Sequence, residues 1–153
     1  MNKNISIHPS ILKIKKEIID SRRYFHKYPE LSFEEYNTAK VIKKKLLDIG
    51  ISVKSGIAKT GLVGIIKGKK AGKTIALRAD MDALPIQETS KITYKSTNKG
   101  VMHACGHDGH MATLIGAAKA IYSQRDKING TVKLIFQPAE EGFAGAKHMI
   151  NEG

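Results

Sequence analysis

Apolar residues in the first fifty positions recur at intervals of three and four, which is the spacing of amphipathic helices. This pattern predicts a helix over residues 10–27, with Ser10 as its N-terminal cap. Ser32 and Glu35 match a capping box and predict the start of a second helix, which Gly50 closes as a left-handed C-terminal residue. We therefore expect two helices, each burying one face, before any strand.

After Gly50 the pattern changes to short β-branched runs separated by glycine and lysine, which indicates strands over residues 51–54, 62–67 and 74–77. The run at 62–67 and the run at 73–77 are expected to pair as a hairpin across the turn Gly-Lys-Lys-Ala-Gly. Residues 75–77 are all apolar, which predicts a strand buried on both faces. A further strand is expected at 131–136, with helices at 108–124 and 144–152.

This order of elements predicts an α/β fold, in which helices flank a mixed sheet. Residues 85–100 lack a regular pattern and are expected to form a long surface loop. The sequence shows neither an internal repeat nor a flexible linker, so residues 1–153 are expected to form one unit.

The composition is that of a globular chain, since 41% of its 153 residues are hydrophobic. No apolar run approaches the ~18 residues of a membrane span, and the first ten residues lack the apolar core of a secretory signal. Cys105 is the only cysteine and cannot form an internal disulfide, which fits a reducing compartment. We expect a cytoplasmic protein that does not enter a membrane.

The net charge of +12 raises the question of nucleic-acid binding. Most of this charge comes from lysines that are spread from Lys3 to Lys147, without an arginine-rich arm or interleaved aromatic residues. Such a distribution is typical of solvated surfaces, and we expect no nucleic-acid partner.

The richest chemistry lies in residues 101–111, which contain His103, Cys105, His107, Asp108 and His110. A single histidine or cysteine is more often a packed core residue, but clustering favours a metal site. In an extended segment His103, Cys105 and His107 would point to one side, whereas on a helix His107 and His110 would do so. The spacing leaves both sets open.

Two pairs of carboxylates follow apolar strands elsewhere in the chain. Asp80 and Asp82 come after the run at 74–77, and Glu140 and Glu141 come after the run at 131–136. Paired glutamates often only complement a helix N-terminus. A sheet would nevertheless bring these pairs to the histidine and cysteine cluster, as in a metal hydrolase where one glutamate binds the ion and its neighbour moves a proton.

Four segments, RYFHKYPELSFEE (23–35), LRADMDALP (77–85), MHACGHDGH (102–110) and QPAEEG (137–142), together resemble the M20-type metallopeptidases. Within these they resemble the amidohydrolase branch, which includes hippurate hydrolase and N-acyl-amino-acid amidohydrolases. The resemblance implies that Cys105, His107 and Glu141 bind metal and that Glu140 is the general base.

The remaining cluster residues have supporting roles under this resemblance. Asp80 stands where the wider family has the histidine of a His-x-Asp ligand motif, so Asp80 and Asp82 are expected to support the site without binding metal. His103 and His110 are then expected to be packing or supporting groups.

The resemblance also implies a cofactor, a substrate and a domain organisation. It implies a divalent metal, zinc, manganese or cobalt, with two ions per full-length subunit, and a small N-acyl amino acid as substrate. Residues 1–153 are expected to be the N-terminal part of a catalytic domain, without the lid domain through which full-length relatives form homo-oligomers. We expect this chain alone to be inactive. The alternative is a non-catalytic module of the same fold that binds metal or a partner.

Overall fold

The computed structural model describes residue 7 and residues 9–153. Along the chain two helices are followed by three strands, and then by a helix, a fourth strand and a last helix. Their bounds are α1 Pro9–Lys27, α2 Tyr36–Ile49, β1 Ser52–Ile57, β2 Gly61–Lys67, β3 Lys70–Asp80, α3 His107–Ser123, a short 3-10 helix Arg125–Lys127, β4 Asn129–Gln137 and α4 Gly145–Asn151. No helix among these described residues is both long and apolar enough to cross a membrane.

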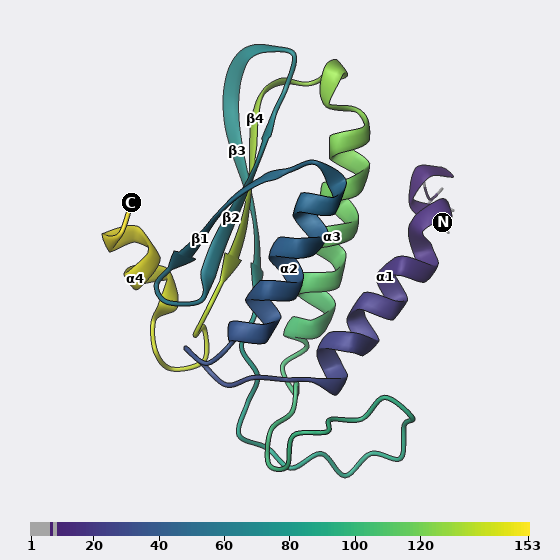
Figure 1. The fold of residues 1–153 in the computed structure, drawn as a ribbon, viewed down its shortest axis with the longest axis vertical. Coiled ribbons are helices and arrows are strands. Elements are labelled where there is room, and N and C mark those ends of the chain that lie inside the picture. The colour runs from purple at the N-terminus through teal and green to yellow at the C-terminus, as the bar shows by residue number, and fades with distance from the viewer. Residues whose placement is uncertain (1–6, 8) are drawn as a thin grey trace, which may run out of the picture.

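The four strands form one mixed sheet in the order β1-β2-β4-β3. Strand β2 is antiparallel to β1 and to β4, whereas β3 and β4 are parallel. The three longer helices lie on one side of the sheet, and α4 lies on the other (Figure 1). The predicted α/β class with a mixed sheet is confirmed.

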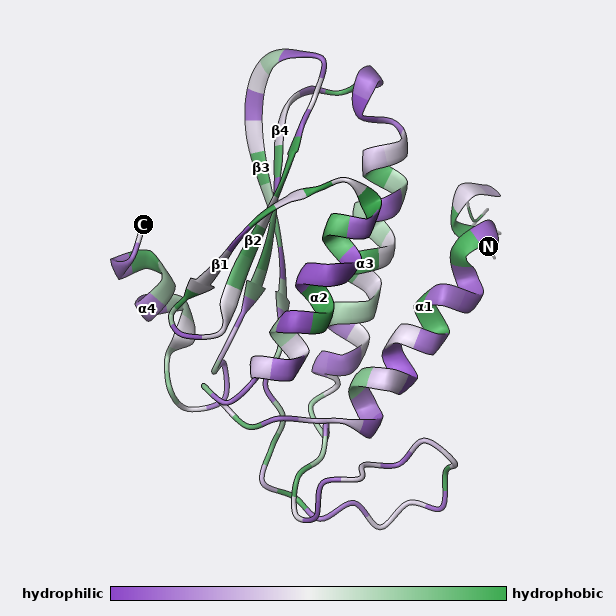
Figure 2. Ribbon diagram, in the orientation of Figure 1, coloured by the Kyte–Doolittle hydropathy of each residue, from purple (hydrophilic) through white to green (hydrophobic). Residues whose placement is uncertain are grey.

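The core lies between the sheet and helices α2 and α3, where apolar faces meet. Figure 2 shows the hydrophobic colour concentrated along the central strands and on the helix surfaces that face them. Residues in this layer that are almost fully buried include Ile42, Leu46, Leu62, Ile66, Met111, Ala118, Leu134 and Phe136. This packing fixes the ends of β3 and β4 relative to the start of α3.

The predicted hairpin between the second and third strands is wrong, because β4 lies between β2 and β3. The connection after β2 bonds to the start of β4 and to the residue before it, with the Gly68 N–H donating to Gly130 O and the Lys69 N–H donating to Ile128 O. Strands β3 and β4 pair in parallel because α3 connects them as a crossover helix.

The expectation that residues 75–77 are buried on both faces is also wrong. Strand β3 is at the edge of the sheet, and the Ile75 side chain is 60% exposed. Only the last two residues of β3, Ala79 and Asp80, are buried. An apolar run indicates a strand, but the run alone does not show whether neighbouring elements cover it.

The capping-box prediction is wrong as well. Helix α2 begins at Tyr36, and the N–H groups of Asn37 and Thr38 donate to the Glu30 carboxylate at 3.2 and 2.8 Å. Ser32 and Glu35 instead bond to more distant segments. The predicted C-terminal end of α2 is confirmed, because Gly50 has φ +99° and its N–H bonds to Leu47 O. Helix α1 begins at Pro9, so Ser10 lies within its first turn.

Candidate metal centre

The candidate residues collect where the parallel strands β3 and β4 end, close to the start of α3. Parallel strands present their carboxyl ends at the same edge of a sheet, and sites of α/β proteins commonly lie there. Asp80 is the last residue of β3, and Glu140 and Glu141 follow β4 by three and four residues. Residues 85–100 form the predicted loop without helix or strand, and a bridge between Leu84 and Met102 closes its base.

Cys105, His107 and Glu141 form one set of candidate metal ligands. One donor atom from each lies within 4.8 Å of those from the other two. Gly106 separates the first two residues and has φ +95°, a left-handed conformation that turns the backbone immediately before α3. His107 is buried, Glu141 is half-buried and Cys105 is exposed, so the set opens to solvent on the cysteine side.

Asp82 fixes the orientation of the His107 ring. Its Nδ1 donates to the carbonyl oxygen of Asp82 at 2.8 Å and lies 3.3 Å from the Asp82 carboxylate. Nε2 remains as the nitrogen that can bind a metal, 3.9 Å from the Glu140 carboxylate. Burial lowers the pKa of His107, but the contacts with Asp82 and the charge of Asp80 outweigh burial and raise it.

Asp82 joins three segments of the site. Its Oδ2 accepts hydrogen bonds from Ser32 Oγ at 2.8 Å and from the Glu141 N–H at 2.9 Å. Burial raises the pKa of this carboxyl, but hydrogen bonds from His107, the Glu141 backbone and Ser32 more than offset it, so the pKa lies well below its usual range. Asp82 is therefore ionised, and its contacts hold Ser32, His107 and the Glu141 backbone together.

A second set of donor atoms consists of Asp80, His107 and His110. The two histidine rings are 5.3 Å apart at positions i and i+3 of α3, and His110 Nδ1 lies 3.7 Å from Asp80 Oδ2. Both sets use His107, whose Nδ1 is already bonded, so the two sets would compete for Nε2. Arg78 is 2.7 Å from the other Asp80 oxygen and neutralises part of its charge.

The chemistry of the first set fits a divalent metal. The hydrogen bond to Glu141 raises the pKa of the Cys105 thiol, as do burial and the negative charges of Glu141, Glu140 and Asp80. Three carboxylates thus crowd a thiol, and a bound cation would relieve this repulsion and favour the thiolate. Thiolate, imidazole and carboxylate together suit zinc, manganese or cobalt.

His103 belongs to neither set. Its side chain is buried, and neither ring nitrogen has a hydrogen-bond partner among the described residues. Burial lowers the pKa of His103 to about 4, so the ring is neutral at physiological pH. His103 is thus a buried side chain outside both candidate ligand sets.

Glu35 supports the site in a way that the sequence did not indicate. This fully buried carboxylate accepts hydrogen bonds from Thr60 Oγ1 at 2.5 Å and from the Ala139 N–H at 2.9 Å. Ala139 has φ +51° in the turn that carries Glu140 and Glu141. Glu35 lies in a motif of the resemblance, but its pattern with Ser32 indicated a helix cap.

Comparison with known proteins assigns the family. Residues 76–153, half of the chain, match the model of peptidase family M20/M25/M40, and the chain belongs to this family. This match includes every residue of both candidate ligand sets.

Curated relatives place the chain in the branch that contains amidohydrolases. It is 51% identical to thermostable carboxypeptidase 1 of Saccharolobus solfataricus, over 94% of this chain and 37% of the relative. It is 49% identical to the hippurate hydrolase of Campylobacter jejuni, over 97% and 38% respectively. The chain therefore spans less than two-fifths of the length of these relatives.

A solved structure agrees with the fold. The crystal structure of the Bacillus subtilis YxeP protein, a dinuclear metal-binding peptidase of the M20 family, is 44% identical and superposes with a TM-score of 0.88. The match covers 92% of this chain and 40% of that chain. This agreement confirms that the sheet and its helices are part of the family's fold.

Proposed function

We propose that this chain carries the metal-binding and proton-transfer groups of a hydrolase that splits N-acyl amino acids into a carboxylic acid and an amino acid. The observation that carries the proposal is the convergence of donor atoms from Cys105, His107 and Glu141, next to Glu140. Elements far apart in sequence supply these groups, and the fold brings them to one edge of the sheet.

Cys105, His107 and Glu141 would hold the ion, which when bound polarises the scissile carbonyl and acidifies water. Glu140 lies beside this set, and its side chain is 39% exposed, so it can reach a water molecule in the opening. It takes the proton of the attacking water and returns it to the amine as the C–N bond breaks. Asp82 keeps His107 in the tautomer that presents Nε2.

The names of the relatives point to different amides. One is a hippurate hydrolase, one a carboxypeptidase and another, 49% identical, an N-acetyl-L-cysteine deacetylase from Bacillus subtilis. The proposed substrate class, an amide formed with an amino acid, is broad enough to include all three.

The test compares the whole encoded protein with its Glu140→Gln variant on hippurate and on N-acetyl amino acids. We expect the variant to keep its metal and to lose a factor of about 10²–10⁴ in kcat, the usual loss when a general base is removed. Glu34→Gln, on an exposed neighbour of the buried Glu35, is the matched control and should keep the wild-type rate. Wild-type hydrolysis by Glu140→Gln would refute the assignment of the base. Metal binding without hydrolysis by the wild type would favour a binding module.

A further inference from the structure

A cluster of four ionisable side chains, three of them buried and one half-exposed, lies beside the candidate metal centre. His26 of α1 is almost fully buried between two buried carboxylates, with Nδ1 2.7 Å from Asp108 Oδ2 and Nε2 3.2 Å from Glu88 Oε1. Arg22 Nε lies 2.9 Å from the same Asp108 oxygen. We refer to Arg22, His26, Glu88 and Asp108 as the ion cluster.

His26 bridges two carboxylates. Its Nδ1 contacts Asp108 and its Nε2 contacts Glu88, so both ring nitrogens have a carboxylate partner. Burial raises the pKa of Glu88, but hydrogen bonds from Ser90, Ser96 and His26 outweigh burial and lower it, so Glu88 is ionised. Each of the two buried carboxylates thus has a basic side chain as its partner, the condition under which buried acidic groups are tolerated.

On one side the ion cluster holds the long loop over residues 85–100. Glu88 Oε2 accepts the Ser96 N–H at 2.6 Å, so one carboxylate joins His26 to two points of the loop. Further bonds run from the Thr97 N–H to Lys27 O at 2.9 Å and from Asn98 Nδ2 to Pro29 O at 2.6 Å. The loop is thus attached below the C-terminal end of α1, where Figure 1 shows it.

On the other side the ion cluster holds the start of α3. Asp108 is adjacent to His107, and its second oxygen accepts the Gly109 N–H at 2.8 Å, which fixes the side chain in the first helical turn. The loop base, closed by the Leu84–Met102 bridge, leads directly to the turn that carries Cys105. Displacement of the loop or of Asp108 would therefore move both Cys105 and His107.

We propose that His26 is a positioning residue for the metal centre, acting through Asp108 and Glu88 to fix the turn that bears Cys105 and His107. This inference rests on the proposed metal-binding role of those two residues. His26 itself binds no metal in this account, because both of its nitrogens are already bonded to carboxylates.

The experiment titrates the chain and its His26→Gln variant with Co²⁺, following the thiolate-to-cobalt charge-transfer absorption. Glutamine cannot bridge both carboxylates as the imidazole does. We therefore expect the Co²⁺ concentration at the midpoint of the titration to rise about tenfold, a loss of affinity typical when a residue that orients metal ligands is removed. The absorption at saturation should be unchanged, because Cys105 still binds. His148→Gln, on an exposed histidine of α4, is the control and should titrate as wild type.

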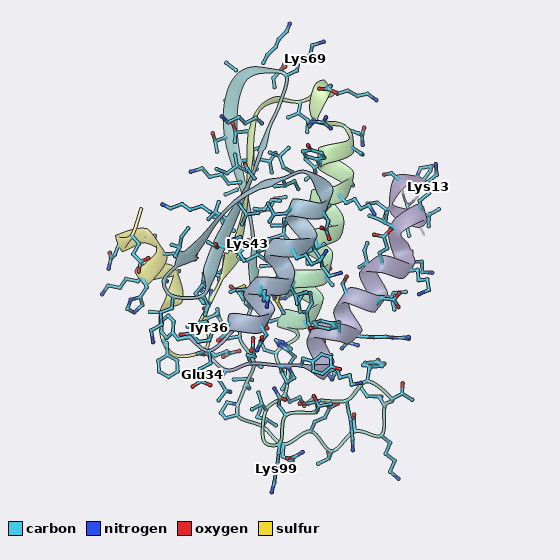
Figure 3. All side chains as sticks on the ribbon, in the orientation of Figure 1. Lys13, Glu34, Tyr36, Lys43, Lys69 and Lys99 are labelled. Atoms are coloured by element: carbon cyan, nitrogen blue, oxygen red, sulfur yellow. The ribbon has the colours of Figure 1, made fainter. Side chains whose placement is uncertain are left out.

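Limited trypsin digestion provides the second readout. Lys91, Lys95 and Lys99 are exposed on the loop, and Lys99 extends away from the body of the molecule in Figure 3. We expect severalfold faster cleavage at these lysines in His26→Gln than in wild type. If circular dichroism shows that His26→Gln is unfolded, the Co²⁺ titration and the trypsin digestion are repeated with Glu88→Gln. This variant removes the carboxylate charge of the loop and leaves the contact between Arg22 and Asp108.

The outcomes separate this inference from the proposed function. Wild-type chain without the thiolate absorption would remove Cys105 from the metal site and refute the proposed function. Wild-type chain with the absorption, together with an unchanged midpoint and unchanged cleavage in the folded variant, would overturn the role of His26 alone.

Discussion

Replacing Glu35 with alanine tests how the turn that carries Glu140 and Glu141 is held. The change removes the hydrogen-bond acceptor of two buried donors, Thr60 Oγ1 and the Ala139 N–H. Leaving a buried donor unsatisfied costs about 1–3 kcal/mol, so we expect Glu35→Ala to lose about 4 kcal/mol of unfolding free energy. In a chain of this length that corresponds to a fall in Tm of about 8–16 °C.

Glu35→Gln separates the hydrogen bonds from the charge. Its amide oxygen can accept from the Ala139 N–H, while its NH₂ group can donate to Thr60 Oγ1. Burial raises the pKa of Glu35, and hydrogen bonds lower it less, so folding favours the protonated acid. The stability contributed by the acid is therefore complete below about pH 4 and is lost as pH rises through the raised pKa. Glutamine lacks this dependence, so its stability relative to wild type should improve from pH 4 to pH 8.

Urea unfolding followed by circular dichroism measures both effects. Glu34→Ala is the matched control, because Glu34 is the exposed neighbour that Figure 3 labels, and it should change stability by less than about 0.5 kcal/mol. A loss below about 1 kcal/mol in Glu35→Ala would show that this carboxylate does not hold the turn. If the unfolding free energy of wild type instead increased relative to that of Glu35→Gln as pH rises, the sign of the pKa shift would be contradicted.

Three further predictions address the two ligand sets, the cap and the chain as a whole. Cys105→Ser should lower metal content more than His110→Ala, measured by elemental analysis, and the reverse ranking would move the site to Asp80, His107 and His110. Glu30→Ala should destabilise the chain by about 1 kcal/mol in urea because two N–H groups of α2 lose their acceptor, whereas equal stability would show that water replaces it. The 153-residue chain alone should not hydrolyse hippurate, since each set supplies three donors and the sets share His107; release of glycine at a rate near that of full-length relatives would refute this.

Patterns that depend on neighbouring residues predicted the helices well. The helical spacing before residue 50 and the glycine at its end hold in the structure because both features are local. The hairpin failed because β4, some fifty residues later, inserts between β2 and β3. The local sequence around residues 68–72 is that of a turn in either arrangement, so pairing depends on the rest of the fold.

The site, too, was predicted only in part, because some of its contacts join segments that are distant in sequence. The rule that parallel strands end at one edge correctly gathered Asp80, Glu140 and Glu141 near the histidine and cysteine segment. The spacing of the residues did not show whether Cys105 or His110 would share a metal ion with His107. In the structure both lie close enough to His107 to do so. Neither Glu35, which was predicted only as a helix cap, nor His26 was expected to support the site. Ala139 lies 104 positions from Glu35 and Asp108 lies 82 positions from His26, and no local pattern reveals such contacts.

X-ray absorption at the zinc edge tests directly whether Cys105, His107 and Glu141 bind one metal ion. In zinc-loaded chain we predict one sulfur ligand at about 2.3 Å, together with nitrogen and oxygen ligands at about 2.0–2.2 Å. Cys105→Ser should lose the sulfur shell and keep the lighter one. A spectrum of wild-type chain with only nitrogen and oxygen ligands would contradict the account, because it would place the ion away from Cys105.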